Sequence, residues 1–159
     1  GFNMNVLYTD IQRQPEVEAE LGLRFVGLDE LLEKSDFISL HSYLSAENYH
    51  MIGKAQFEKM KPTAILINTA RGGLIDPDAL TTALQQGQIA AAGLDVFEPE
   101  PIPADHPLLS LENVVIAPHI ASASVQTRLR MALMAAENLI AGLHGLRLPY
   151  CANPAVYKD

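Results

Sequence analysis

The chain alternates short runs of apolar residues with segments that carry helical signals, and this alternation limits the fold more than any other feature. The apolar runs show little polar alternation, which indicates strands that are buried on both faces. Strands separated by helices of this length are joined by crossovers and lie parallel in a sheet. The sequence therefore predicts an α/β fold, a partial doubly wound parallel sheet followed by a long C-terminal helix.

The element boundaries follow from capping and breaking residues. Asp76 can act as an N-cap, Pro77 falls at the first helical position, and Asp78 adds negative charge where the helix dipole favours it. Four prolines make the stretch 98–107 an extended loop. The predicted strands are 4–9, 23–26, 36–41, 64–68, 89–95 and 113–117. The predicted helices are 15–21, 28–34, 54–60, one that starts at Asp76 and stops at Gly87, and 122–143.

Composition excludes several classes of function. A length of 159 residues fits one domain, and 48% hydrophobic residues supply a core. The net charge of −8 argues against a nucleic-acid partner, which would need a basic surface. No apolar run reaches the roughly 18 residues of a membrane span. The single cysteine, Cys151, rules out an internal disulfide framework and favours a reducing compartment, so we expect a cytoplasmic protein.

Ligands of doubly wound sheets bind outside the carboxyl ends of the strands, so the polar residues that follow each apolar run are the candidates for a site. This rule selects Asp10, His41, the segment 68–71 that ends in Arg71, Asp95 and His119. Asp10 could accept the hydroxyls of an adenosine ribose, or it could cap a turn. Arg71, before two glycines, could bind a planar carboxylate bidentately, or it could be a surface residue.

Histidine is the commonest general acid or base, and the chain has five, at positions 41, 50, 106, 119 and 144. Most of them must be bystanders. His119 differs because it ends an apolar strand and precedes a run of small residues, and His41 is its best rival. No pair has the spacing of a metal site, so we expect no bound metal. Asp95 and Glu100 flank the neighbouring loop, and either could be merely solvated.

Four blocks of sequence, 1–10, 68–76, 92–101 and 118–122, resemble the D-isomer-specific 2-hydroxyacid dehydrogenases in their order and spacing. Segments 101–109 and 118–124 are most similar to glyoxylate/hydroxypyruvate reductases. The resemblance implies a partial Rossmann-like NAD-binding domain over residues 1–121, and a C-terminal helix and tail, 122–159, that would pack on a substrate domain. It also implies NAD-dependent reduction of a small 2-oxo acid to the D-2-hydroxy acid, and a homodimer.

The resemblance assigns roles to individual residues. Arg71 would bind the carboxylate and carbonyl oxygen of the substrate, and His119 would act as general acid in reduction and base in oxidation. Glu100 would pair with His119, and its negative charge would favour the imidazolium. Asp95 would contact the nicotinamide carboxamide, and Asp10 the adenosine ribose. The backbone at Thr69 and Ala70, with Arg71 and His119 beside it, would line the nicotinamide pocket.

The sequence departs from the family in two places. Tyr43 replaces the usual proline in a loop that borders the adenine, and no G-x-G-x-x-G motif occurs. In the family this motif and most of the substrate domain precede the equivalent of Gly1, so we expect a C-terminal fragment that is inactive alone. Asp10 favours NAD, whereas Arg13 nearby keeps NADP open. The alternative function is a non-catalytic, truncated Rossmann module that acts as a dimerising or binding unit.

Overall fold

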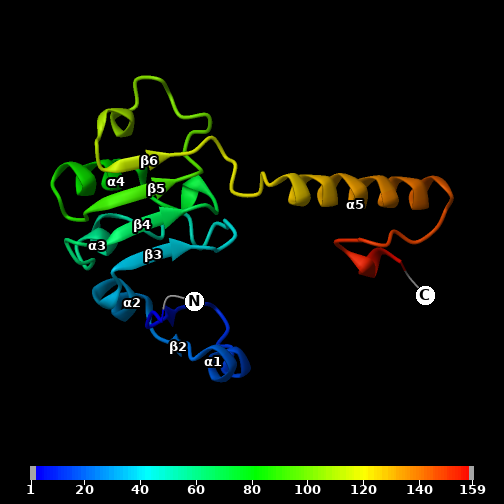
Figure 1. Ribbon diagram of the computed structural model, residues 1–159, viewed down its shortest axis with the longest axis horizontal. Coiled ribbons are helices and arrows are strands. Elements are labelled where there is room, and N and C mark those ends of the chain that lie inside the picture. Colours follow the sequence, from blue (N-terminus) through cyan, green and yellow to red (C-terminus); the bar gives the residue numbers. More distant parts are fainter. Residues whose placement is uncertain (1–2, 158–159) are drawn as a thin grey trace. The chain divides into compact units, whose positions relative to one another are not determined.

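The computed structural model describes residues 3–157 (Figure 1). The chain divides into two compact units, Gly1–His119 and Ile120–Asp159. All the strands among the described residues belong to the first unit, and the longest helix, α5 (Val125–Leu143), belongs to the second. The two units are therefore an α/β layer structure and a helical element with its tail.

The first unit is built on a four-stranded parallel sheet in the order β3-β4-β5-β6. In Figure 1 the four arrows point the same way, so their carboxyl ends share one edge. The strands are β3 (Phe37–Leu40), β4 (Ile65–Asn68), β5 (Ala91–Leu94) and β6 (Val114–Ile116). Their connections contain α3 (Lys54–Phe57) and α4 (Pro77–Gln85), and α2 (Leu28–Lys34) precedes β3. This arrangement confirms the predicted α/β class.

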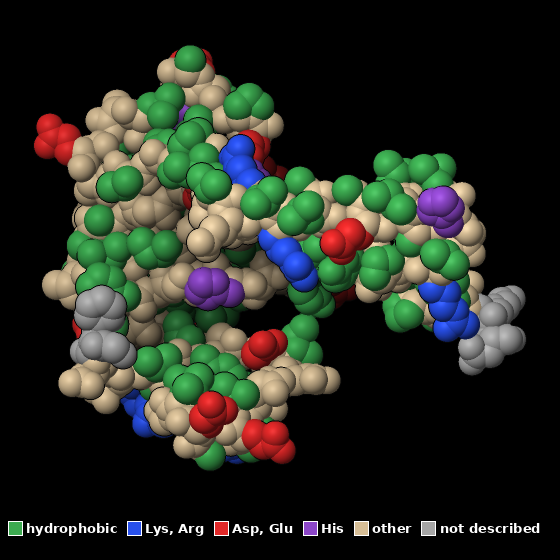
Figure 2. All heavy atoms as spheres, turned by 45° about the vertical axis from the view of Figure 1, so that its right-hand side comes forward, with side chains coloured by type: hydrophobic (Ala, Val, Ile, Leu, Met, Phe, Trp, Pro, Cys, Tyr) green, Lys and Arg blue, Asp and Glu red, His purple; other side chains and the backbone are tan. Residues whose placement is uncertain are grey.

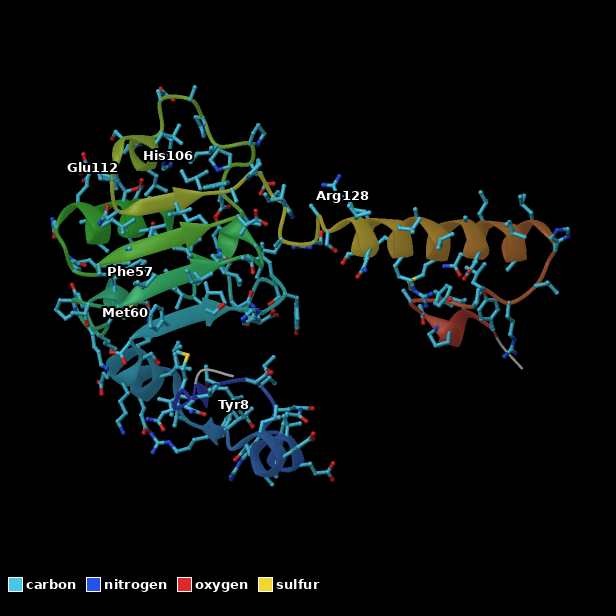
Figure 3. The ribbon with its side chains drawn as sticks, in the orientation of Figure 1. Tyr8, Phe57, Met60, His106, Glu112 and Arg128 are labelled. Atoms are coloured by element: carbon cyan, nitrogen blue, oxygen red, sulfur yellow. The ribbon has the colours of Figure 1, made fainter. Side chains whose placement is uncertain are left out.

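Only one face of the four-stranded sheet is fully covered by the described residues. Leu66 and Leu94 are buried, together with Phe57 and Met60 from the α3 region, which Figure 3 labels. The opposite face carries apolar side chains as well, and there Phe37 is 58% and Val115 72% exposed. The prediction that both faces are covered is therefore wrong for this part of the chain. Its basis was sound, because the strands do present apolar residues on both faces.

The first two strands form a separate sheet. β1 (Leu7–Tyr8) pairs in parallel with β2 (Arg24–Phe25), and α1 (Pro15–Leu21) connects them. A broad hollow lies between the unpaired edge of β1 and β3, lined from both sides by residues that include Val6 and Phe37. The described strands therefore make two sheets where the sequence predicted one.

Local capping sets where the helices begin and end. Asp76 accepts hydrogen bonds from the backbone amides of Asp78 and Ala79, both at 3.0 Å, which confirms the predicted N-cap. α3 is shorter than the predicted 54–60, because the amides of Lys59 and Met60 bond three residues back and tighten the chain into turns. α5 begins at Val125 rather than at residue 122. Its N-cap, Ser124, has extended backbone angles and accepts a hydrogen bond from the Thr127 amide.

The second unit consists of α5 and a tail that folds back on it. The Asn138 side chain bonds both the carbonyl and the amide of Tyr150, at 3.1 and 3.0 Å, and the Tyr157 hydroxyl accepts from the Leu148 amide. α5 buries none of its residues, and Figure 2 shows hydrophobic side chains over much of the visible surface of this unit. Within residues 3–157, no helix combines the length and apolarity needed to cross a membrane.

Candidate active site

The carboxyl ends of β4, β5 and β6 bring three of the predicted site segments to one edge of the sheet. Thr69, Ala70 and Arg71 follow β4, Asp95 follows β5, and His119 follows β6 three residues after its last strand position. Neighbouring strands lie about 4.8 Å apart, which places the ends of β4 and β6 about 10 Å from each other. A small molecule can therefore contact residues from all three strand ends at once.

The turn after β4 is held by the side chain of Asn68. This residue is 1% exposed; its Oδ1 atom accepts a hydrogen bond from the Ala70 amide at 3.0 Å, and its Nδ2 atom donates to the Arg71 carbonyl at 2.9 Å. A buried amide with both ends bonded fixes the path of the backbone. Asn68 is therefore a positioning residue for Arg71, a role that the strand-end rule did not specify.

Arg71 presents its guanidinium at this edge. Its Nη1 atom donates to the Ala70 carbonyl at 2.6 Å, and the side chain is exposed. Among residues 3–157, no carboxylate forms an ion pair with Arg71. Because a guanidinium presents several donors in a planar fork, Arg71 can bind an incoming carboxylate bidentately.

His119 and Glu100 form a hydrogen-bonded pair. The His119 Nδ1 atom lies 2.6 Å from the Glu100 Oε1 atom, and Glu100 Oε2 accepts a bond from the Phe97 amide at 3.3 Å. The hydrogen bond from His119 is the main reason why the pKa of Glu100 lies below its ordinary value. The His119 backbone has a φ of +54°, a conformation uncommon outside glycine, which points to a constraint on where the imidazole sits.

A second histidine–glutamate pair adjoins the first, and sequence reasoning missed it. The His50 Nε2 atom lies 2.8 Å from Glu98 Oε2, the Tyr49 hydroxyl donates to Glu98 Oε1 at 3.0 Å, and the Tyr49 and His50 rings stack 3.9 Å apart. Glu98 is two residues from Glu100, so this cluster anchors the loop that carries Glu100. No local pattern links His50 to a residue 48 positions away, and only the proximity of Glu98 to Glu100 hinted at it.

The remaining predicted residues are placed as follows. Asp95 is 4% exposed, and its amide donates to the Asn68 carbonyl. Asp10 follows β1 in the smaller sheet, where its exposed carboxylate accepts a bond from the Ile11 amide. His41, the rival to His119, contacts Ser39 at 2.9 Å and joins neither carboxylate pair. In the described part of the chain, no group of three or more His, Cys, Asp or Glu side chains could hold a metal ion.

Comparison with known proteins gives consistent matches over most of the chain. It is similar to a glyoxylate reductase of Korarchaeum cryptofilum, with 58% identity over 99% of this chain and 48% of that protein. It is also 52% identical to a glyoxylate/hydroxypyruvate reductase B of Pectobacterium atrosepticum, over 99% of this chain and 49% of that protein. The crystal structure of D-lactate dehydrogenase with NAD⁺ from Lactobacillus jensenii matches with a TM-score of 0.83 and 38% identity, covering 93% of this chain and 48% of that one.

The chain spans about half the length of the curated relatives it matches. The structural match confirms the predicted Rossmann-like fold. Residues 1–121 match the family model described as "D-isomer specific 2-hydroxyacid dehydrogenase, NAD binding domain". The chain therefore belongs to the D-isomer-specific 2-hydroxyacid dehydrogenase family.

Proposed function

We propose that the intact protein reduces a small 2-oxo acid of the glyoxylate or hydroxypyruvate type to the D-2-hydroxy acid, with NADH as the reductant. The observation that carries this proposal is the 2.6 Å pair of His119 and Glu100 on the sheet edge that also presents Arg71. Both relatives named as glyoxylate reductases support the substrate class. Residues 1–121 would form part of the NAD-binding domain, and residues 122–159 would pack on a substrate domain. The intact protein would form a homodimer through its NAD-binding domain.

The residues present fit both ends of a nicotinamide dinucleotide, the nicotinamide and the adenosine ribose. Thr69 and Ala70 expose backbone and small side chains beside Arg71, and Asp95 supplies a carboxylate at the next strand end. Asp10 supplies an exposed carboxylate for the ribose hydroxyls at the end of β1. When bound, the reduced nicotinamide supplies the hydride. This chain's own residues would orient the cofactor and the substrate.

The proton chemistry falls to His119. Arg71 would hold the substrate carboxylate and turn the carbonyl oxygen toward the imidazole. Because Nδ1 is engaged by Glu100, Nε2 is the ring nitrogen that would give its proton to the carbonyl oxygen during reduction and take it back during oxidation. Glu100 would keep the imidazole in that orientation.

The direct test is an assay of the intact protein with NADH and either glyoxylate or hydroxypyruvate, following the loss of NADH absorbance and the chirality of the product. We expect turnover and a D-configured product from hydroxypyruvate. A protein that binds NADH but turns over neither acid would refute the substrate class. A protein that does not bind NADH would refute the proposed function itself.

Glu100→Gln is expected to lower kcat at neutral pH by about tenfold or more and to remove the acid limb of the pH profile. The pKa of Glu100 is lowered by its hydrogen bond from His119, so in the wild type the carboxylate stays ionised at neutral pH. It protonates only as the pH falls through that lowered value, below the ordinary pKa of a glutamate. The wild-type kcat should therefore drop in that range, whereas kcat of the variant should be low and flat there.

Glu112→Gln is the matched control, because it removes the same charge at the amino end of β6, away from the site (Figure 3). Circular dichroism at each pH separates loss of the ion pair from acid unfolding. The role of Glu100 would be contradicted if both variants kept the wild-type profile.

A further inference from the structure

Arg13, in the loop between β1 and α1, forms a bidentate ion pair with Glu18 of α1, called the fork below. The fork involves neither Asp10 nor the sheet edge that carries Arg71 and His119. Arg13 Nε donates to Glu18 Oε1 at 2.8 Å, and Arg13 Nη2 donates to Glu18 Oε2 at 2.9 Å. The Glu18 side chain is 12% exposed, whereas that of Arg13 is 62% exposed. The carboxylate is therefore seated against the protein, and the arginine that it holds remains largely exposed to solvent. Arg13 lies three residues after Asp10, the proposed ribose ligand.

Tyr8 fixes the carboxylate of this fork. Its hydroxyl donates to Glu18 Oε1 at 2.8 Å and accepts from the Gln14 amide at 2.7 Å. Its ring packs edge-on against Phe25 with 5.3 Å between centroids, so the strand pair β1–β2 holds the hydroxyl in place (Figure 3). Burial raises the pKa of Tyr8, and the bond from Arg13 lowers the pKa of Glu18. The donor therefore stays protonated and the acceptor stays ionised.

The charges in and near this loop affect whether the protein binds NAD or NADP. NADP differs from NAD by a phosphate on the adenosine ribose, and Rossmann proteins that accept it place an arginine near that phosphate. Arg13 is the only cation in residues 9–22, where Asp10, Glu16, Glu18 and Glu20 supply negative charge. A guanidinium already engaged on two nitrogens by a carboxylate is a poor partner for a second anion.

We infer that Glu18 is a specificity-determining residue that occupies Arg13 and so favours NAD over NADP. The inference rests on the proposed function, because it concerns the cofactor of that reaction. The sequence left the cofactor open, because Asp10 favoured NAD whereas Arg13 was compatible with NADP. If Glu18 occupies Arg13, both residues favour NAD. Glu18 acts through Arg13 and touches no part of the cofactor.

The test is a fluorescence titration of the intact protein with NADPH and with NADH, which gives the ratio of the two dissociation constants without any turnover. Glu18→Gln removes the charge of the carboxylate but keeps an acceptor for the Tyr8 hydroxyl. We expect it to shift the ratio toward NADPH by about fivefold, the scale of an exposed bidentate ion pair. Glu20→Gln is the matched control: it removes the same charge from the same helix, at an exposed position, and should shift the ratio by less than about twofold.

Two further variants make the role of Arg13 explicit. Adding Arg13→Gln to Glu18→Gln should abolish the shift toward NADPH. Arg13→Gln alone should leave the ratio within about twofold of the wild type, since Arg13 is already engaged. This last measurement does not depend on Glu18→Gln folding correctly.

Each other outcome overturns something definite. Equal shifts in Glu18→Gln and Glu20→Gln would mean that net charge alone sets the preference. A loss of NADPH binding in Arg13→Gln alone would mean that Arg13 serves the phosphate in the wild type. Either result refutes the inference and leaves the proposed function standing. A wild-type protein that binds neither nucleotide refutes both.

Discussion

Replacing His119 with alanine is expected to lower kcat/KM of the intact protein for a 2-oxo acid by about 100-fold to 10,000-fold. The reason is that the proposed mechanism assigns the transfer of a proton to the carbonyl oxygen to the imidazole of His119. His119 is held at Nδ1 by Glu100 at 2.6 Å and at its backbone by the turn after β6, so its removal leaves a carboxylate with no proton to deliver. The loss should fall mainly on kcat, with the dissociation constant for NADH changing little.

Arg71→Ala should produce a comparable loss with a different signature. Because Arg71 would bind the substrate in both the ground state and the transition state, its removal should raise KM as well as lower kcat. Arg71→Lys should recover only part of the loss, since an ammonium keeps the charge but not the planar fork.

His144→Ala is a suitable control for both variants, because His144 is exposed at the C-terminal end of α5. Steady-state kinetics with glyoxylate and hydroxypyruvate measure all three. Wild-type turnover in both His119→Ala and Arg71→Ala would contradict the assignment of the site.

The sequence could place Arg71 and His119 at the ends of strands because the strands of a parallel sheet follow a repeating pattern of apolar runs. Each residue lies three positions after the end of an apolar strand, and parallel strands joined by crossovers end at a common edge. The register of β4, β5 and β6 confirms that their carboxyl ends align. The same reasoning could not assign Glu100, which lies within a proline-rich loop that has no periodicity. That residue depended on family resemblance.

Two other features could not be predicted, because they depend on contacts between distant segments. The cluster of Tyr49, His50 and Glu98 joins residues 48 or 49 positions apart across two irregular loops. The exposure of one sheet face could not be predicted either. Apolar residues in a strand indicate that both faces can be buried, but they do not show whether a helix covers each face. Phe37 and Val115 are apolar residues of the kind found in strands that are covered on both faces, and they are nevertheless exposed.

Gly72→Ala is expected to destabilise the first unit by about 1–3 kcal/mol or more, the range for inserting atoms where no space exists. A Cβ on Gly72 would overlap the carbonyl oxygen and carbon of Phe97 and would lie 2.7 Å from the Glu98 amide nitrogen. These are backbone atoms, which cannot turn away as the end of a flexible side chain can. The backbone φ of Gly72 is not in the left-handed region, so the expected loss comes from packing alone.

Gly27→Ala is the matched control, because a Cβ there would meet nothing within 4 Å and its φ of −67° suits any residue. Thermal denaturation followed by circular dichroism should show a lower Tm for Gly72→Ala and a nearly unchanged Tm for Gly27→Ala. Equal Tm values would contradict the close approach of the β4 turn to the Phe97 loop. That approach brings the loop of Glu100 against the turn of Arg71. Gly72→Ala should therefore also lower kcat under conditions in which the variant stays folded, because the chain can relieve the overlap only by moving one catalytic segment away from the other.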